Sequence, residues 1–245
     1  MARMLKLTPK RLQEGLAHLA TVDPDMARAI AEVGHPPMRT SDPGFATLLR
    51  SIMGQQVSVH AARSIWEKLN RLVSPMTPET MMMASDATLR EAGLSAQKAR
   101  YAKALAADIV EKRLDFDGVH LMEDEAAIAE LSKALGVGRW TAEIYLMFAL
   151  GRVDIMPGND LGLITAAGHL KGLRKRPDEK KLRRMAEQWK PWRSVASLVL
   201  WHYRHNMPDW SEPGQKKAAS KAAKKTVKKG AKKAARKKTG KAKYK

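Results

Sequence analysis

Apolar residues recur at the spacing of an α-helix along most of the first 210 residues of the chain. In the segment 45–53 they occupy positions i, i+3, i+4, i+7 and i+8, so they line one face of a helix. Several such segments begin after a residue that caps helices well, among them Thr8, Ser58 and Ser95. No segment shows the two-residue alternation of a half-buried strand. The sequence therefore predicts an all-α fold of many short helices.

Charge is distributed unevenly along the chain, which has a formal net charge of +20. Between Gly214 and Lys245, 15 residues are Lys or Arg and none is Asp or Glu, so the rest of the chain holds 30 basic and 25 acidic residues. This tail has too little apolar bulk to offset the entropy of ordering. We expect a helical core over residues 1–210 and a disordered basic tail over residues 211–245. The tail either binds DNA and other polyanions nonspecifically or only aids solubility.

The absence of cysteine excludes disulfides, Cys-ligated zinc and iron–sulfur clusters on Cys ligands. Of the seven histidines, the pair His202 and His205 has no evident third ligand, so we expect no metal on side chains and no cofactor. The first residues lack the apolar segment of a signal peptide, and no run of about 18 apolar residues occurs. We expect a soluble protein of the cytoplasm or nucleoid, or of the nucleus in a eukaryote, with no membrane partner.

A glycine turn interrupts the helical pattern at the segment ALGVGRW, residues 134–140. A nucleotide-binding loop would need a preceding strand and a further glycine or a Gly-Lys-Ser/Thr sequence, and neither is present. Two interpretations remain: a plain connector between helices, which the spacing alone favours, and a helix-hairpin-helix that holds a nucleic acid. In the second case the glycines admit a phosphate, and the unpaired N–H groups of the next helix bind it without reading sequence.

Several motifs together resemble the helix-hairpin-helix DNA glycosylases that carry a Gly/Pro-rich loop followed by an aspartate. The hairpin Leu135-Gly136-Val137-Gly138 and the loop Pro157-Gly158-Asn159-Asp160 match this family in order and spacing. Residues 54–58, 93–101 and 189–201 resemble it too, so the likeness covers roughly residues 40–205. Within the superfamily the chain is most similar to the alkylated-base branch, 3-methyladenine DNA glycosylase II. The resemblance implies a monomer with two helical lobes, one shared by the N- and C-terminal helices, and an active site between them.

Asp160 is the candidate catalytic residue, because the resemblance assigns it the position of the aspartate after the loop. By composition alone Asp160 is an ordinary cap of the helix that follows, and the two roles are compatible. Rupture of an N-glycosidic bond gives the sugar oxocarbenium character. A carboxylate that faces this charge stabilises it and can orient or deprotonate a water molecule.

Trp140 stands where strand-cutting members of the family carry a Schiff-base lysine, at the start of the helix after the hairpin. The resemblance therefore implies a monofunctional enzyme that uses water and has no lyase activity. An indole also attracts the cationic base that forms when a purine ring nitrogen is alkylated. The resemblance places Trp201, Tyr145 and Gln55 with Trp140 in the base pocket, although Trp201 taken alone would be interpreted as a core aromatic.

The remaining site residues concern the grip on DNA. A base must leave the duplex to be excised, and the resemblance assigns the filling of the gap to Gln56; the alternative is a polar residue in an ordinary helix–helix turn. The hairpin residues expected at a phosphate are Leu135, Gly136, Val137, Gly138, Arg139 and Thr141. For Arg139 a plain solvated cation is the alternative. The resemblance alone also implies a monovalent ion on the backbone carbonyls of Ala134 and Val137.

The leading hypothesis is a monofunctional DNA glycosylase that acts on double-stranded DNA in base excision repair. It would flip out alkylated purines of the 3-methyladenine and 7-methylguanine type, hydrolyse their N-glycosidic bond and leave an abasic site. One rival is a non-enzymatic DNA-binding or nucleoid protein, in which Asp160 is only a helix cap. The other is the same fold acting on deaminated or oxidised bases.

Overall fold

The computed structural model describes residues 6–207, which are mainly helical with short connections. The α-helices are α1 Pro9–Val22, α2 Pro24–Val33, α3 Phe45–Met53, α4 Val59–Leu72, α5 Pro78–Met83, α6 Asp86–Glu91, α7 Ala96–Val110, α8 Asp124–Leu131, α9 Arg139–Phe148, α10 Leu161–Leu170, α11 Glu179–Met185 and α12 Arg193–Asn206. Two short 3₁₀ helices are η1 Gly118–Leu121 and η2 Ala186–Trp189. Residues 6–207 form no strand, only an isolated bridge between Lys6 and Arg152. The all-α prediction is confirmed, and the predicted disordered tail, residues 211–245, lies outside the described residues.

Side-chain caps begin several helices at the positions that the sequence predicts. Thr8, Ser58 and Ser95 each accept the backbone N–H of the residue three positions later, at the starts of α1, α4 and α7. Helix α2 was not anticipated, although Asp23 followed by Pro24 is a start signal of the same kind. Asp23 caps α2 by accepting the N–H groups of the second and third helical residues.

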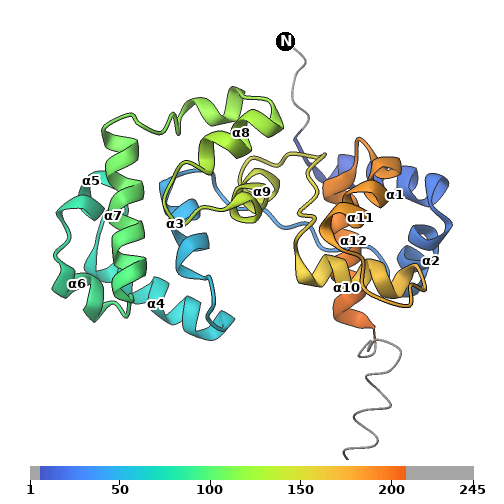
Figure 1. Ribbon diagram of the computed structural model, residues 1–245, viewed down its shortest axis with the longest axis horizontal. Coiled ribbons are helices and arrows are strands. Elements are labelled where there is room, and N and C mark those ends of the chain that lie inside the picture. Colours follow the sequence, from blue (N-terminus) through green and yellow to red (C-terminus); the bar gives the residue numbers. More distant parts are fainter. Residues whose placement is uncertain (1–5, 208–245) are drawn as a thin grey trace, which may run out of the picture.

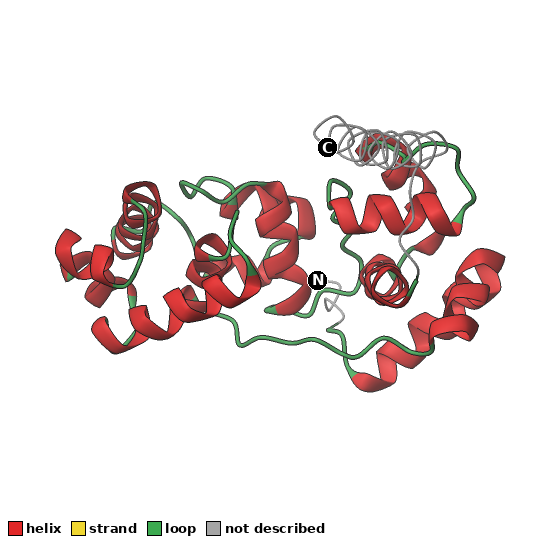
Figure 2. Ribbon diagram, turned by 90° about the horizontal axis from the view of Figure 1, so that it is seen from below, coloured by secondary structure: helices red, strands yellow, loops and turns green. Residues whose placement is uncertain are grey.

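The helices form two lobes, each around its own apolar core (Figures 1 and 2). The first lobe contains α3 to α9, and its core is built from residues 45–155. The second lobe combines α1 and α2 with α10 to α12, so residues 7–29 and 153–207 share one core. The expected sharing of one lobe by the N- and C-terminal helices is confirmed. The first lobe is therefore an insertion between two parts of the second.

Helix α7 packs against α3, α5 and α6 in the first lobe (Figure 1). The five apolar residues of segment 45–53 are all buried, as their helical spacing predicts. The apolar residues of α4 follow helical spacing, but Leu69 is buried while Leu72 is 39% exposed. The helix ends at Leu72. The backbone of the next residue, Val73, is extended, and the side chain of Val73 is buried in the core instead.

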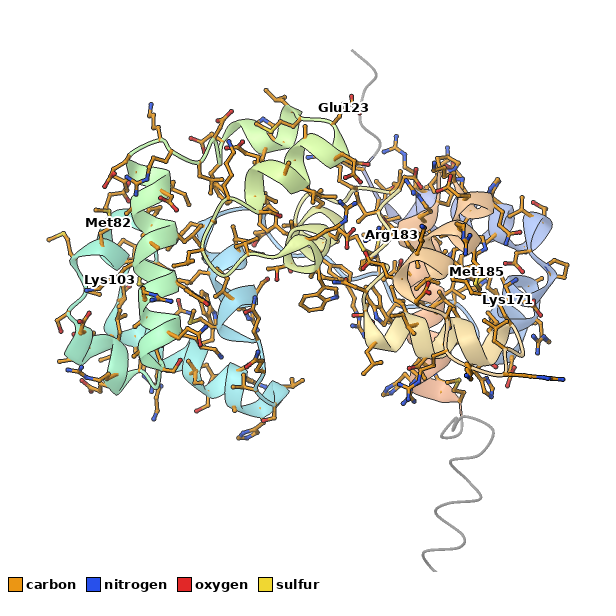
Figure 3. All side chains as sticks on the ribbon, viewed as in Figure 1. Met82, Lys103, Glu123, Lys171, Arg183 and Met185 are labelled. Atoms are coloured by element: carbon orange, nitrogen blue, oxygen red, sulfur yellow. The ribbon has the colours of Figure 1, made fainter. Side chains whose placement is uncertain are left out.

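The second lobe packs around α12, which contacts α1, α2 and α10. Trp189 is fully buried there, and its indole N–H donates to a carboxylate oxygen of Asp23 at 2.8 Å. The ammonium group of Lys171, labelled in Figure 3, donates to the other oxygen at 2.5 Å. A buried carboxylate requires such partners, since an unpaired charge in the interior is strongly destabilising. These bonds join the start of α2 to the end of α10 and to the turn before α12.

The two lobes meet where α9 faces α12. Phe148 of α9 and Trp201 of α12 each pack against both cores, and their ring centroids lie 5.8 Å apart. The backbone of the connecting segments is also tied to this junction. The N–H of Ser41 donates to the carbonyl of Phe148 at 2.8 Å, and the N–H of Leu7 donates to the carbonyl of Gly151 at 2.6 Å. Both ends of the inserted lobe are thus held together beside α9.

Candidate active site

Asp160 begins α10 at the junction of the lobes. Its Oδ1 accepts the backbone N–H of Leu163 at 2.9 Å, which is the bond of an N-cap. Capping leaves the carboxylate half-buried rather than enclosed, so the capping role does not exclude a chemical one. Asp154, the nearest acid before it, is bound by the guanidinium of Arg193, with Nε–Oδ1 at 2.8 Å and Nη2–Oδ2 at 3.0 Å. Of these two carboxylates, Asp160 is therefore the one left for chemistry.

Two tryptophans, one from each lobe, donate to the carboxylate of Asp160. The distance from Trp140 Nε1 to Oδ2 is 3.0 Å, and that from Trp201 Nε1 to Oδ1 is 3.1 Å. Each oxygen therefore has its own indole donor, which fixes the orientation of the carboxylate. A Cβ at Gly162 would lie 3.0 Å from Asp160 Oδ1 and 3.4 Å from the Trp201 ring. The missing side chain at Gly162 thus allows the indole to approach the carboxylate.

A cavity of about 530 Å³ opens beside this carboxylate. It is bounded by α9 of the first lobe, by α12 and the start of α10 in the second, and by the segment between α2 and α3. Its lining is Arg39, Trp140, Ile144, Phe148, Asp160, Trp201, Arg204 and His205. The structure therefore brings three predicted site residues, Asp160, Trp140 and Trp201, to one cavity at the junction of the lobes. Small-molecule sites typically have volumes of about 300–1,000 Å³.

Three polar residues of the cavity wall were not anticipated: Arg39, Arg204 and His205. Arg204 and His205 follow Trp201 by three and four residues, so they share its face of α12, and this spacing was available in the sequence. Arg39 offered no comparable signal, because it lies in an irregular segment. Within residues 6–207 the guanidinium groups of Arg39 and Arg204 form no hydrogen bond or ion pair. Both are free to bind an anion.

Tyr145, predicted to line the base pocket, lies outside the cavity. Its side chain is buried in the core of the first lobe, where the hydroxyl accepts the N–H of Gly44 at 2.9 Å. Ile144, one residue earlier, lines the cavity instead. The reason is helical geometry, since Ile144 follows Trp140 by four residues and Tyr145 follows it by five. The assignment of Tyr145 to the pocket is corrected.

Gln55, also predicted in the base pocket, is directed to the glycine hairpin. Its side-chain amide donates to the carbonyl of Gly136 at 3.0 Å and to the hydroxyl of Thr141 at 3.2 Å. These bonds connect the turn between α3 and α4 with the turn between α8 and α9. The assignment of Gln55 to the pocket is therefore corrected to a contact between two turns.

The predicted glycine turn is a tight connection between α8 and α9. Gly136 has a φ of +88°, and a Cβ there would lie 2.4 Å from the ring of Tyr101, so only glycine fits. Val137 is buried and Leu135 is 43% exposed. Gly138 begins α9 without a side-chain cap, and a Cβ at this position would have no neighbour within 4 Å. The backbone N–H groups in the first turn of α9 are therefore open to an anion.

Arg139 and Thr141 do not present their side chains to a phosphate, which corrects the role predicted for them. Arg139 forms a bidentate pair with Glu125 at 2.6 and 2.9 Å, and its Nε donates to Glu143 at 2.9 Å. The hydrogen bonds to Glu125, with the charge of Glu143, raise the pKa of Arg139 above its ordinary value. Thr141 is buried, with its hydroxyl accepting from Gln55. Any contribution of these two residues to a phosphate site would come from their backbone N–H groups.

A chain of ion pairs joins the hairpin to the loop 156–160. Glu143 of α9 is buried, and its Oε1 accepts from Arg139 at 2.9 Å and from Arg183 at 2.8 Å. Arg183 of α11 also donates to the backbone carbonyl of Met156 at 2.7 Å; its label in Figure 3 lies at the edge of the second lobe that faces α9. Burial raises the pKa of Glu143 even though both cations act to lower it. The first turn of α9 and the loop that leads to the catalytic candidate thus share one network.

Gln56, the predicted gap-filling residue, lies in the turn between α3 and α4 and is exposed. Its φ is +57°, a left-handed conformation that is uncommon for a residue with a side chain. Exposure leaves the side chain free to enter a duplex. The gap-filling role itself stays a prediction.

Metal binding has little support from side chains. Among residues 6–207, no group of three or more His, Asp or Glu is arranged to hold a metal ion. His202 Nε2 lies 2.9 Å from the carbonyl oxygen of Val33, whereas His205 is exposed and lines the cavity. The carbonyl of Ala134 accepts the N–H of Val137 at 3.0 Å and keeps a second lone pair. The monovalent ion implied at the carbonyls of Ala134 and Val137 stays a prediction.

Within the described part of the chain, no helix has the length and apolar character needed to cross a bilayer.

Comparison with known proteins identifies relatives along most of the chain. Residues 49–192 match the family described as HhH-GPD superfamily base excision DNA repair protein. The alkylbase DNA glycosidase-like protein mag2 of Schizosaccharomyces pombe is 32% identical over 192 residues, which cover 75% of this chain and 90% of that protein.

Solved structures of two similar proteins share the fold. One is the 3-methyladenine DNA glycosylase Mag1 of Schizosaccharomyces pombe in complex with abasic DNA, with a TM-score of 0.70 and 25% identity over 81% of this chain and 100% of that chain. The other is a DNA-3-methyladenine glycosidase from Bacillus halodurans, with a TM-score of 0.71 and 32% identity over 83% of this chain and 93% of that chain. With its hairpin, loop and aspartate in place, this chain belongs to the HhH-GPD superfamily of base excision DNA repair proteins.

Proposed function

We propose that this protein is a monofunctional DNA glycosylase that removes alkylated purines from double-stranded DNA and leaves an abasic site. The observation that carries the proposal is the carboxylate of Asp160, held by two indole N–H groups at the wall of a cavity of about 530 Å³. The relatives agree with it: mag2 is named alkylbase DNA glycosidase-like, and Mag1 is a 3-methyladenine DNA glycosylase in complex with abasic DNA. Both lobes of one chain complete the cavity, so a monomer suffices.

In the proposed reaction the damaged nucleotide leaves the duplex and its base enters the cavity. As the N-glycosidic bond breaks, positive charge develops on the sugar. Asp160 stabilises that charge and orients the attacking water molecule. Because Trp140 and Trp201 already hold the carboxylate, little reorganisation is needed when the charge develops.

The lining of the cavity supports hydrolysis without strand cutting. A Schiff-base step requires a lysine beside the sugar. No lysine among residues 6–207 lines this cavity. Trp140 stands at the position where strand-cutting relatives carry that lysine, so the expected product is an abasic site in an intact strand.

The aromatic walls favour a purine that carries positive charge. Trp140, Phe148 and Trp201 all line the cavity, and a cation over an aromatic face gains about 0.5–2 kcal/mol. Alkylation at a ring nitrogen makes a purine cationic and also makes it a better leaving group. Such a base therefore needs less help from a protein acid than an undamaged one.

Grip on the duplex would come from contacts to phosphates. The first turn of α9 presents open N–H groups next to Gly138. The guanidinium groups of Arg39 and Arg204, which have no partner among residues 6–207, lie at the cavity wall, where phosphates flanking a flipped nucleotide would lie. The tail from Gly214 to Lys245 would add nonspecific, salt-sensitive affinity.

The test is release of free base from duplex DNA that contains N3- or N7-methylpurines. Wild type should release the base, whereas Asp160→Asn should lose release by about a hundredfold or more, as expected when a charge-stabilising group is removed. Equal release by the variant would show that Asp160 only caps α10.

Two controls separate the alternatives. Strand cleavage by wild type without added alkali would contradict the absence of a lyase step. Binding of DNA without release of any base would favour a DNA-binding protein, and release from deaminated or oxidised duplexes alone would change the lesion class.

A further inference from the structure

Helix α7 holds the turn that carries Gln56. Lys98, in the first turn of α7, donates through its ammonium group to the carbonyl of Met53 at 2.6 Å and to that of Gln55 at 2.9 Å. The last carbonyls of a helix lack partners within it and carry partial negative charge, so a cation at the end of α3 is favourable on both counts. Lys98 therefore holds the backbone of Gln55, the residue just before Gln56, in place.

Gln55 is held from three sides. Its carbonyl accepts from Lys98, and its N–H donates to the carbonyl of Ile52 at 3.2 Å. Its side-chain amide donates to the carbonyl of Gly136 and to the hydroxyl of Thr141. The turn between α3 and α4 is thus fastened both to α7 and to the glycine hairpin.

Gln56 itself has little to hold it. Within residues 6–207 its side chain forms no hydrogen bond, and it is exposed. Its left-handed backbone, with φ +57°, costs about 1 kcal/mol or more in a residue other than glycine. A cavity of about 260 Å³, lined in part by Gln56 and Lys98, lies beside the turn, so close packing does not fix it from that side. The conformation of Gln56 depends on the bonds of its neighbours.

The same helix also sets the hairpin. The ring of Tyr101, one turn after Lys98 on α7, packs against Gly136 so closely that a Cβ would lie 2.4 Å away. Helix α7 therefore contacts both the turn that carries Gln56 and the hairpin that is open to phosphate. The distance between these two DNA-facing features is set by one rigid element.

We infer that Lys98 and Gln55 are positioning residues that hold Gln56 at a fixed distance from the phosphate-binding hairpin, ready to fill the gap left by a flipped base. The inference rests on the proposed function for the base-flipping step. A group that must enter the duplex as the base leaves acts best when it is already in place, because ordering a mobile turn would oppose the step. Neither Lys98 nor Gln55 touches the cavity that holds Asp160.

The first experiment compares Lys98→Met with Lys103→Met on the same helix. Lys98→Met keeps the apolar stem and removes both bonds to the turn, whereas Lys103→Met removes an equal charge and only an exposed pair with Asp86. The readout is single-turnover base release at saturating enzyme. We expect Lys98→Met to slow release about tenfold, the order of effect of a misplaced group, and Lys103→Met to slow it less than about twofold. Equal rates in the two variants overturn the inference.

A double-mutant cycle with Gln56→Ala tests whether Lys98 acts through Gln56. If it does, adding Lys98→Met to Gln56→Ala changes the rate by less than about twofold, because the shared effect is already lost. If the two losses multiply, Lys98 acts by another route and the inference fails. Lys98→Arg keeps the charge and the donors, so it should recover most of the rate that Lys98→Met loses.

A second readout separates this inference from the proposed reaction. 2-Aminopurine placed opposite an abasic-site analogue reports by fluorescence how the gap is filled, and no excision is needed. If wild type gives the signal but releases no base, the proposed reaction fails and the inference stands. If Lys98→Met gives the wild-type signal, the inference fails. Gln55→Met removes only the bonds to the hairpin and should also lower the signal. If thermal unfolding shows that Lys98→Met does not fold, Gln55→Met takes its place in this test.

Discussion

Asp160 accepts three N–H donors, one from the backbone of Leu163 and two from the indoles of Trp140 and Trp201. Two of these donors belong to the second lobe and one to the first. A carboxylate held in this way keeps its place only while the lobes keep theirs. The position of the Asp160 carboxylate therefore depends on how the two lobes pack against each other. Small substitutions beside Asp160 should change the rate of base release more than the stability of the fold.

Gly162→Ala is expected to slow base release without loss of stability. Alanine favours an α-helix over glycine by about 1 kcal/mol, but its methyl group would lie 3.0 Å from Asp160 Oδ1 and 3.4 Å from the Trp201 ring. The carboxylate or the indole must therefore move. We expect single-turnover release to fall about tenfold or more, while the midpoint of thermal unfolding stays equal or rises. Wild-type release by this variant would mean that the carboxylate tolerates the shift.

The structure brings Asp160, Trp140 and Trp201 together at one cavity and directs Tyr145 and Gln55 elsewhere. Asp160 and Trp140 stand at the starts of helices, where the order of motifs fixes them, and they share the cavity. Tyr145 was misplaced because a one-residue step on a helix turns a side chain by about 100°, and the sequence does not say which of two neighbours faces the cleft. Arg39 could not be predicted at all, since an irregular segment has no periodicity to read.

Helix α9 serves two purposes along its length. Its first turn offers unpaired N–H groups, and Glu143, one turn further, is buried against Arg183 of α11. Only Oε1 of Glu143 has hydrogen-bond partners among the described residues; Oε2 is buried without one. The buried carboxylate of Glu143 is therefore stabilised only through Oε1, which accepts from Arg139 and Arg183. Its charge state should depend on them.

Arg183→Met is expected to destabilise the fold more at about pH 8 than at about pH 5. Burial raises the pKa of Glu143 above its ordinary value of 4.5, and Arg183 opposes this rise, so the variant keeps Glu143 protonated to a higher pH. At a pH where Glu143 is protonated in the folded protein, its pair with Arg183 adds nothing to stability. Above the pKa of Glu143 in the variant, the buried carboxylate is charged and has lost one of its cationic partners. At the higher pH we expect the free energy of unfolding, measured by urea denaturation, to fall by an amount on the order of 1–3 kcal/mol. Arg184→Met, on the exposed side of α11, should show no such pH dependence.

Some helix starts and buried faces could be predicted because local signals in the sequence mark them. The start of α1 at Thr8 and the buried face of α3 follow directly from local signals. Leu72 continues the stripe of α4 but is exposed, because the helix ends there and the first lobe does not extend to cover it. That outcome depends on how α4 packs in its lobe, which no local pattern contains.

The whole molecule combines a nearly balanced core with a strongly basic tail. Of the 45 Lys and Arg residues, 15 lie between Gly214 and Lys245. The residues of the cavity and of the hairpin all precede this basic segment in the sequence. We therefore expect the tail to add nonspecific affinity for any duplex, and the cavity to recognise a damaged base.

Deletion of residues 214–245 is expected to weaken nonspecific binding to DNA and to leave chemistry intact. Fewer phosphate contacts release fewer counterions, so the slope of log affinity against log salt concentration should become shallower. Fluorescence anisotropy of an undamaged duplex at several salt concentrations measures it. Single-turnover release at saturating enzyme should stay within about twofold of the full chain. An unchanged slope would contradict this role of the tail.

Because the first lobe is inserted within the second, the order of translation differs from the order of assembly. Residues 45–155 can begin to fold before the rest of the chain is made, since every buried residue of their core lies between Phe45 and Ile155. Helices α1 and α2 emerge earlier, yet they have no complete core until α10 to α12 are made. A nascent chain therefore acquires its hairpin first, and Asp160 gains its donor from Trp201 only near the end of synthesis. A ribosome-bound chain that already holds DNA would still lack a finished cavity.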